Sequence, residues 1–204
     1  MKSGIVIGLQ AMKLMTVFTL LLGGIYTLAM TGMAQLFFPA QAAGSLLWSP
    51  DHTVLYGSKL IGQPFADETH LWGRDMKLSD EGFTAADDTT LLYSGPTNEA
   101  ATGEALKARV AARVERIRAA NPEMGDTPIP ADLVTVSGSG LDPEISPAAA
   151  EYQVKRLART TGRSEEEIRG IIAVCTEGRF LGIFGEPRVN VVEVNLRLDG
   201  RREK

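Results

Sequence analysis

The chain has 204 residues, of which 44% are hydrophobic and 23% are charged, a composition typical of globular proteins. Its single cysteine, Cys175, excludes an internal disulfide. Up to Trp48 the only charged side chains are Lys2 and Lys13, so 19 basic and 25 acidic groups, a net charge of −6, fall on the remainder. Because nucleic-acid-binding proteins carry a basic excess or a basic stripe, this pattern argues against nucleic acid as a partner.

The first predicted element is a helix that spans the lipid bilayer. Residues 14–38 carry no charge, and a helix needs about 20 apolar residues to cross the hydrocarbon core. The predicted organisation is a short cytoplasmic tail at 1–13, a transmembrane helix at 14–38, a linker at 39–50 and a folded domain at 51–204. This chain is therefore predicted to be a single-pass membrane protein.

The charges that flank this helix predict its orientation. Lys2 and Lys13 precede the helix, whereas the first charge after it is Asp51. Since positively charged flanks remain in the cytoplasm, we expect a cytoplasmic N-terminus and an extracytoplasmic domain, at the plasma or inner membrane. The alternative is a cleaved signal peptide, with a small-x-small site at residues 40–42, but its apolar region would be only about 7–15 residues long.

Small side chains line one side of the predicted helix. Thr19, Gly23, Thr27 and Thr31 recur at every fourth position. Small residues allow a second helix to approach closely, so this stripe predicts a packing surface for a partner helix. The alternative is chance, because such residues are common in membrane helices.

The first half of the domain is predicted to contain one clear helix. Residues 56–65 favour a loop or short strand ends, and residues 79–103 favour a long irregular excursion. Apolar residues in 104–120 recur at helical spacing, and Asn121-Pro122 ends the pattern. The arginines on its other faces could bind an anion, but interspersed glutamates favour a solvated face.

The second half is predicted to mix helices and strands. Residues 132–136 favour a buried strand, and Ser146 caps a helix that runs to about Arg159. Strict alternation over 192–198 predicts a strand with one solvated face. Because helices and strands alternate without a regular βαβ rhythm, the domain is predicted to be a compact α+β fold.

A capping box predicts a further helix near the C-terminal end. Ser164 and Glu167 have the spacing at which each side chain can satisfy the other's backbone N–H. Behind them, Ile168, Ile171, Ile172 and Cys175 form an apolar stripe. Cys175 is therefore predicted to fill the core.

No catalytic or metal-binding pattern is found. The glycine-serine run at 137–140 follows a predicted strand as a phosphate loop would, but no G-x-x-x-x-G-K-[ST] follows and Asp142 would repel phosphate, so a structural turn is favoured. With only His52 and His70 in the chain, a zinc site is not expected. The domain is predicted to be a binding or structural module with no cofactor of its own.

Several strings together resemble the KdpC family, the small subunit of the Kdp potassium-transporting P-type ATPases. The longest string is S-G-S-G-L-D-P-x-I-S-P-x-A-A, beginning at Ser137. Stretches 74–77 and 94–98 depart from the common family pattern. The family-motif candidates are Gly57, Gln63, Ser137, Gly138, Ser139, Gly140, Asp142, Pro143, Gln153 and Asn190.

The resemblance implies membership of a membrane complex that takes up potassium. Its partners would be a channel-like potassium-binding subunit (KdpA), a P-type pump subunit (KdpB) and a very small fourth subunit, which together handle ATP, Mg²⁺ and K⁺. The resemblance also implies an assembly role and a catalytic-chaperone role that raises the ATP affinity of the pump, with ATP binding as a family property and no nucleotide-binding residue identified here. The alternative is a stand-alone, membrane-anchored binding protein or enzyme of the cell envelope.

Overall fold

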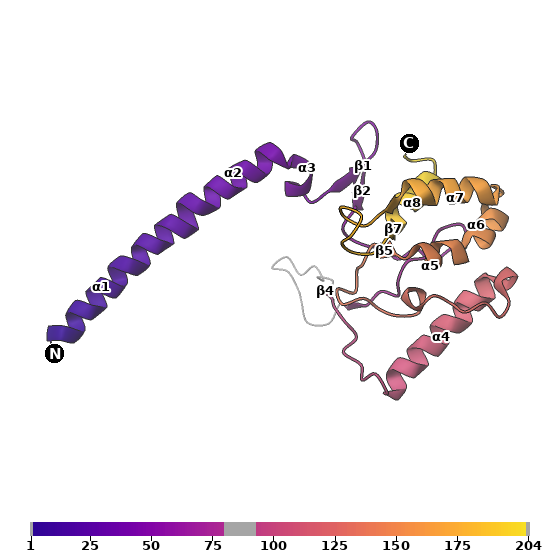
Figure 1. Ribbon diagram of the computed structural model, residues 1–204, viewed down its shortest axis with the longest axis horizontal. Coiled ribbons are helices and arrows are strands. Elements are labelled where there is room, and N and C mark those ends of the chain that lie inside the picture. The colour runs from indigo at the N-terminus through magenta and orange to yellow at the C-terminus, as the bar shows by residue number, and fades with distance from the viewer. Residues whose placement is uncertain (1, 80–92, 203–204) are drawn as a thin grey trace. The chain divides into compact units, whose positions relative to one another are not determined.

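The computed structural model describes residues 2–79 and 93–202. The chain divides into two compact units, residues 1–46 and 47–204. The first unit is helical, and the second mixes helices with short strands (Figure 1). The predicted α+β character of the domain is confirmed.

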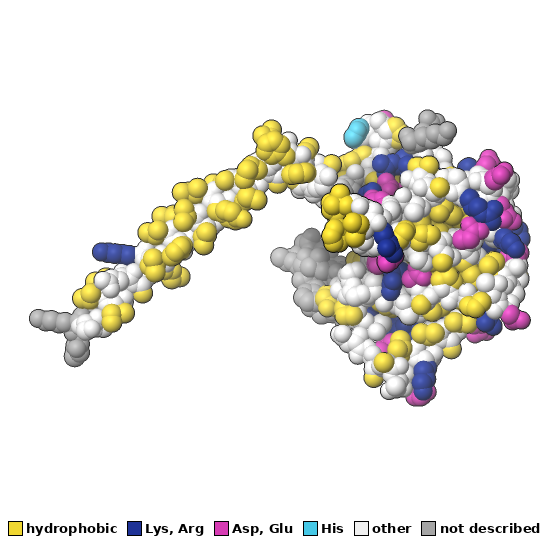
Figure 2. Space-filling view, in the orientation of Figure 1, with side chains coloured by type: hydrophobic (Ala, Val, Ile, Leu, Met, Phe, Trp, Pro, Cys, Tyr) yellow, Lys and Arg dark blue, Asp and Glu magenta, His cyan; other side chains and the backbone are white. Residues whose placement is uncertain are grey.

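The first unit is one long helix followed by a single short turn of helix. α1 (Lys2–Phe18), the π-helical stretch η1 (Thr19–Tyr26) and α2 (Thr27–Phe37) run on without interruption, and α3 (Pro39–Ala42) follows. Within the described residues, the 35 residues Ser3–Phe37 are long and apolar enough to cross a membrane. Apolar side chains cover this helix over most of its length (Figure 2).

This helix begins earlier than the sequence pattern predicted. The predicted tail at 1–13 is helical from Lys2 onward, because nothing in it breaks a helix. The predicted linker at 39–50 contains α3 and β1 (Leu46–Trp48). Which residues lie inside the bilayer, and on which side the second unit lies, remain predictions.

The second unit contains three small sheets. β1 pairs with β2 (Leu55–Ser58), and β3 (Leu78–Ser79) pairs antiparallel with β4 (Tyr93–Ser94). The third sheet is antiparallel in the order β5-β7-β6, and its strands are β5 (Glu144–Ile145), β6 (Thr176–Glu177) and β7 (Arg188–Asn190). Part of the predicted irregular excursion, residues 80–92, lies outside the described residues.

Five α-helices and two short 3₁₀ turns make up the rest of the described part of this unit. They are α4 (Glu104–Ala120), η2 (Pro122–Met124), η3 (Ala131–Leu133), α5 (Pro147–Tyr152), α6 (Val154–Thr161), α7 (Glu165–Val174) and α8 (Val191–Leu198). The helix at 104–120 is confirmed at both ends. Ser146 caps α5 by accepting the Ala149 N–H, and the capping box of Ser164 and Glu167 is present on α7, as predicted.

Two predicted strands are wrong. Residues 132–136 form the 3₁₀ turn η3 and a single bridge from Val136 to Asp75. Side chains compete here for the backbone, because the Asp132 carboxylate accepts the Ser146 N–H and the Thr135 hydroxyl donates to the Ala131 carbonyl. The local turn therefore prevails over the apolar pattern.

Residues 192–198 belong to the helix α8, not to a strand. Six of its eight residues are buried, and the two that are not, Glu193 and Arg197, lie four residues apart on one side of the helix. The polar side chain of Asn195 completes the apparent alternation, yet it is buried because it bonds the backbone of Leu71. The Asn190 side chain starts the helix by accepting the Glu193 N–H at 3.0 Å.

The helix predicted at 147–159 is two helices. α5 ends at Tyr152 and α6 begins at Val154, with Gln153 between them at φ −99° and ψ −5°. The break lets the Gln153 side chain turn into the core, where it bonds the backbone of Trp72.

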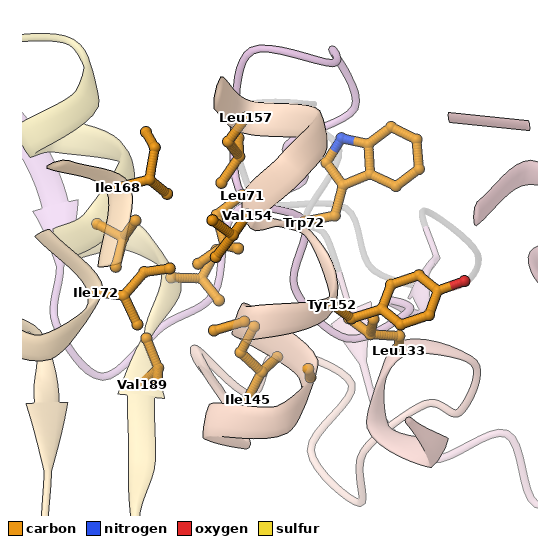
Figure 3. Close-up of a cluster of buried hydrophobic side chains, with 14 of the residues drawn as sticks. Leu71, Trp72, Leu133, Ile145, Tyr152, Val154, Leu157, Ile168, Ile172 and Val189 are labelled. Atoms are coloured by element: carbon orange, nitrogen blue, oxygen red, sulfur yellow. The ribbon is translucent and has the colours of Figure 1, made fainter. Parts of the chain in front are cut away.

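One apolar cluster holds the second unit together (Figure 3). It joins α4 through Ile117, the sheet through Ile145 and Val189, and α7 through Ile168 and Ile172. Cys175 is also a member and is 4% exposed, which confirms its predicted place in the core. A smaller cluster contains Leu47, Val192 and Leu196.

Candidate functional site

The family-motif residues form contacts with one another and with the rest of the domain. Gly57 has φ +143°, a backbone conformation that favours glycine, and a Cβ there would displace the side-chain amide of Gln63. That amide donates to the Tyr56 carbonyl at 2.7 Å. The Gly62 N–H then donates to the Leu141 carbonyl, which ties this loop to the glycine-serine turn.

The turn at 137–143 is stabilised by its own side chains. The Ser137 hydroxyl accepts the Gly140 N–H at 3.0 Å, and the Ser139 hydroxyl accepts the Leu141 N–H at 3.1 Å. The Asp142 carboxylate accepts the Glu144 N–H, and the Pro143 carbonyl accepts an N–H from the start of α8. These hydroxyls and this carboxylate therefore serve the turn itself, as the sequence favoured.

Gly140 lets this turn pack against a distant segment. It has φ +73°, and a Cβ there would lie 2.7 Å from the Gly95 carbonyl oxygen and 3.0 Å from that of Lys77. A Cβ at Gly138, two residues earlier, would have no described atom within 4 Å, so that position could accept a side chain. The two glycines of the motif therefore have different structural roles.

Gln153 and Asn195 each form hydrogen bonds with both the backbone N–H and the backbone carbonyl of one buried residue. Gln153, 1% exposed, accepts the Trp72 N–H at 2.9 Å and donates to the Trp72 carbonyl at 3.0 Å. Asn195 accepts the Leu71 N–H at 2.7 Å and donates to the Leu71 carbonyl at 3.0 Å. Residues 66–74, which we call the clamped segment, form no helix or strand, so these amides replace the missing backbone partners.

Arginines hold the rest of the clamped segment. Arg113 donates to the Gly73 carbonyl and Arg116 to the Ala66 carbonyl, and both guanidinium groups lie over the Trp72 ring. The predicted solvated face of α4 is therefore wrong at Arg113, which is partly buried, whereas Arg116 remains exposed. Burial lowers the pKa of Arg113, and its side chain is used for packing and hydrogen bonding.

Arg156 is the most deeply buried charged group among the described residues. It is 0% exposed, lies 4.5 Å from the Trp72 ring centre, and donates to the carbonyls of Glu68 and His70 through one terminal nitrogen. Its other terminal nitrogen donates to Gln153 at 2.6 Å. Burial lowers the pKa of Arg156 to about 10, which leaves it charged at neutral pH.

Sequence reasoning missed Arg156 and Asn195. Asn195 was assigned to a strand with one wet face, where a polar residue would be solvated. Arg156 lies in a helix that carries several basic residues, and nothing local separates it from its neighbours. The nearest signal in the sequence is Gln153, one of the family-motif candidates, which lies three residues before Arg156.

Two observations limit the kinds of ligand that this region could hold. A cavity of about 270 Å³ lies beside the clamped segment, and Arg74, Asp75, Arg113 and Arg116 are among its lining residues. Small-molecule sites typically have volumes of about 300–1,000 Å³, so this cavity is slightly smaller than that range. Across residues 2–79 and 93–202, no group of three or more His, Cys, Asp or Glu side chains is arranged to hold a metal ion.

The predicted helix-packing stripe lies across the π-helical stretch. Thr19 and Gly23 are inside η1, and Thr27 follows it, with its hydroxyl donating to the Leu22 carbonyl five residues back. A spacing of four residues overshoots one turn in an α-helix and falls short of one turn in a π-helix. The two deviations offset each other, so the four residues of the stripe, up to Thr31, lie close to one side of the helix. Its role in packing remains a prediction.

These features define a class of protein: a folded α+β domain, carried on one apolar helix, whose motif residues build its own interior. The chain matches the family described as KdpC, the K⁺-transporting ATPase c chain, over residues 8–200. It is 45% identical over 191 residues to the potassium-transporting ATPase KdpC subunit of Clostridium botulinum (strain Eklund 17B / Type B), with 94% of each chain covered. It is 50% identical over 192 residues to that of Sorangium cellulosum, with 94% of this chain and 96% of the relative covered.

The chain therefore belongs to the KdpC family, as its motifs predicted. Members of this family are accessory subunits of the K⁺-transporting ATPase and not its catalytic subunit.

Proposed function

We propose that this chain is the accessory subunit of an ATP-driven potassium uptake complex in the cell membrane, where it stabilises the assembled complex. One observation carries the proposal: the family match runs from residue 8 to residue 200 and so includes both the apolar helix and the folded domain. Its partners would be the channel-like potassium-binding subunit, the P-type pump subunit and the small fourth subunit. ATP, Mg²⁺ and K⁺ would be handled by those partners.

The use of the motif residues supports a structural role. Gln63, Gln153 and Asn190 direct their side-chain amides to backbone groups of the domain itself, and Gly140 permits a backbone contact. A motif built to hold a ligand would instead leave polar groups directed into a cavity. The domain would thus present a fixed surface to its partners.

The effect on ATP affinity is proposed to act through assembly. Lys2 and Lys13 favour a cytoplasmic N-terminus, which places the domain outside the cytoplasm, where ATP is scarce. A reporter enzyme fused after Lys204 is expected to be active only outside the cytoplasm. Activity inside would overturn this orientation and would favour direct contact with nucleotide.

Co-purification tests membership of the complex. The tagged full chain, expressed with the channel-like and pump subunits, is expected to elute with both, and the eluate is expected to hydrolyse ATP when K⁺ is added. Elution of this chain alone, with an active complex lacking it, would favour the stand-alone envelope protein.

A matched pair of glycine variants tests whether the shape of the motif turn matters. Gly140→Ala would place a Cβ against the Gly95 carbonyl, so it is expected to lower the yield of complex, whereas Gly138→Ala should not. Both variants are assayed for complex yield and for the Michaelis constant for ATP. Full assembly of Gly140→Ala with a raised Michaelis constant would favour a direct chaperone role over the structural one.

The helix stripe has its own test. Gly23→Leu adds bulk at the centre of the stripe, where close approach of a partner helix needs a small residue. The variant is expected to release the subunit from the complex in mild detergent, whereas Leu21→Ile, within the same helix, should not. Unchanged co-purification of Gly23→Leu would mean that the stripe reflects composition alone.

A further inference from the structure

The hairpin between β6 and β7 ends in an apolar tip, which we define as residues 180–184. Its four large side chains are all exposed: Phe180 by 70%, Leu181 by 74%, Ile183 by 72% and Phe184 by 62%. None of them belongs to either core cluster. Figure 2 shows a group of apolar side chains on this part of the domain.

The backbone of the tip forms its own hydrogen bonds. Phe180 and Phe184 exchange two backbone hydrogen bonds, of 2.8 and 2.9 Å, and close a turn around Gly182. The Gly182 N–H donates to the Arg179 carbonyl and the Ile183 N–H to the Phe180 carbonyl. Leu181 and Gly182 have φ values of +53° and +74°, as this tight turn requires. The tip is thus an ordered structure that displays apolar side chains.

Charged residues surround the base of the same hairpin. Glu177 pairs with Lys59 at 2.6 Å and with Arg188 at 2.6 Å, and Arg188 also pairs with Glu144 at 2.7 Å. The hairpin therefore changes from a charged base to a wholly apolar tip over a few residues. A strand rises by about 3.3 Å per residue, so the tip reaches roughly 10–15 Å beyond this base.

The chain itself keeps the domain beside a bilayer. The helix that is long and apolar enough to cross a membrane ends at Phe37 and the second unit begins at Leu47, so nine residues, 38–46, join them. Four of these form α3, which limits the reach of the joint to about 20–25 Å. A domain of this size has a radius of gyration of about 15 Å, so its surface is always close to lipid.

We propose that the apolar tip at 180–184 inserts into the outer interfacial layer of the lipid bilayer and gives the domain a second membrane contact. Apolar side chains that lie at the headgroup and acyl-chain boundary are buried by about 5–10 Å, a depth that the tip can reach while its charged base stays among headgroups. The salt-bridged base carries both signs of charge, so insertion depends on apolar burial and not on anionic lipid.

Lipid suits this tip better than a protein surface does. Backbone that enters the hydrocarbon core must satisfy its own polar groups, and four of the five N–H groups of the tip donate to nearby carbonyls. The carbonyls of residues 181–183 accept no backbone hydrogen bond from the described residues, so they suit the hydrated headgroup level and not the hydrocarbon core. Protein interfaces typically include about one hydrogen bond per 100–200 Å², whereas no side chain of the tip carries a polar group. Of the residue types enriched at interfaces (Tyr, Trp, Phe, Met and Arg), the tip contains only Phe. A partner subunit on the tip is the competing outcome of the test.

Depth-dependent quenching tests the proposal in the assembled complex. Ile183→Cys carries an environment-sensitive fluorophore, and Ala112→Cys on the exposed face of α4 is the matched control, both in a complex whose other subunits lack accessible cysteines. Cys175 is buried, which raises the pKa of its thiol to about 11, so it should not compete for label at neutral pH. The complexes are reconstituted in phosphatidylcholine vesicles.

The label at position 183 is expected to emit at shorter wavelength than the label at position 112. It is also expected to be quenched by lipids that carry a nitroxide near the headgroup. An unshifted spectrum at position 183 would show a solvated tip and overturn the proposal. A shifted spectrum without nitroxide quenching would mean that a partner subunit covers the tip, and would overturn it equally.

Discussion

The clamped segment at 66–74 and the apolar tip at 180–184 are both short segments outside long helices and strands, yet they are stabilised in opposite ways. The clamped segment is held from outside by the side chains of Gln153, Asn195 and three arginines. The apolar tip is held by its own backbone, and its side chains point away from the core. A loop whose backbone is bonded by distant side chains is therefore part of the core, whereas a loop whose backbone bonds to itself is independent of the core.

The difference follows from sequence distance. Partners of the clamped segment are up to 124 residues away, so the segment is ordered only when the whole domain is folded. The hydrogen bonds of the tip join residues at most four apart, so the tip can form without the core. Damage to the first segment should affect the whole domain, whereas damage to the second should stay local.

The largest expected effect is at Arg156. Arg156→Met would leave the carbonyls of Glu68 and His70 without this donor in the interior, and we expect a loss of about 3–5 kcal/mol in the free energy of unfolding. The measurement is chemical denaturation of the full chain in detergent, followed by near-ultraviolet circular dichroism. Arg169→Met, on α7, removes a half-exposed arginine whose ion pairs are solvated, and should change stability far less. Equal losses would contradict the central place of the clamped segment.

A somewhat smaller effect is expected at Gln153. Gln153→Leu keeps the volume but leaves the N–H and the carbonyl of Trp72 unpaired, which should cost about 2–3 kcal/mol. Gln153→Glu retains an acceptor for the Trp72 N–H and should recover part of this loss. The same denaturation experiment checks both variants. A Leu variant as stable as the unchanged chain would show that the segment is held by apolar packing alone.

The free energy of unfolding is expected to fall at alkaline pH because of Cys175, which lies where the core meets the β6–β7 hairpin. Burial raises the pKa of the Cys175 thiol from 9.0 to about 11, so its contribution to stability is full below pH 9 and is lost as the pH rises from 9 to about 11. The loss should amount to about 2–3 kcal/mol. Cys175→Ala carries a pH-independent cavity cost, so its stability should fall less steeply over the same range. Parallel pH profiles would contradict this assignment.

The smallest effect is expected at the tip. Leu181→Ala removes an exposed side chain and should change the free energy of unfolding by less than about 0.5 kcal/mol. Leu71→Ala makes the same change in the clamped segment, where the side chain is fully buried, and should cost about 2–5 kcal/mol. Similar values for the two variants would remove the contrast between the two segments.

Elements whose signals are local can be predicted from a short stretch of sequence. The apolar helix is encoded in one uninterrupted stretch, and α4 is defined by its own spacing and by Asn121-Pro122. Ser146 and the capping box at Ser164 each act within four residues, and Cys175 follows the stripe of its own helix. In all these cases the residues that interact are near one another in the chain, so a short window contains the whole cause.

The tertiary structure decided the elements whose causes lie far away in the chain. α8 has the alternating pattern of a strand because Asn195 is polar, and only its hydrogen bonds to the distant backbone of Leu71 make this position part of the core. The break at Gln153 is fixed by hydrogen bonds to Trp72, 81 residues away, and residues 132–136 turn because Asp132 meets the Ser146 N–H. Arg156 becomes a core residue only when the carbonyls of residues 68 and 70 surround it, because a buried charge is stable only where donors and acceptors from several segments meet.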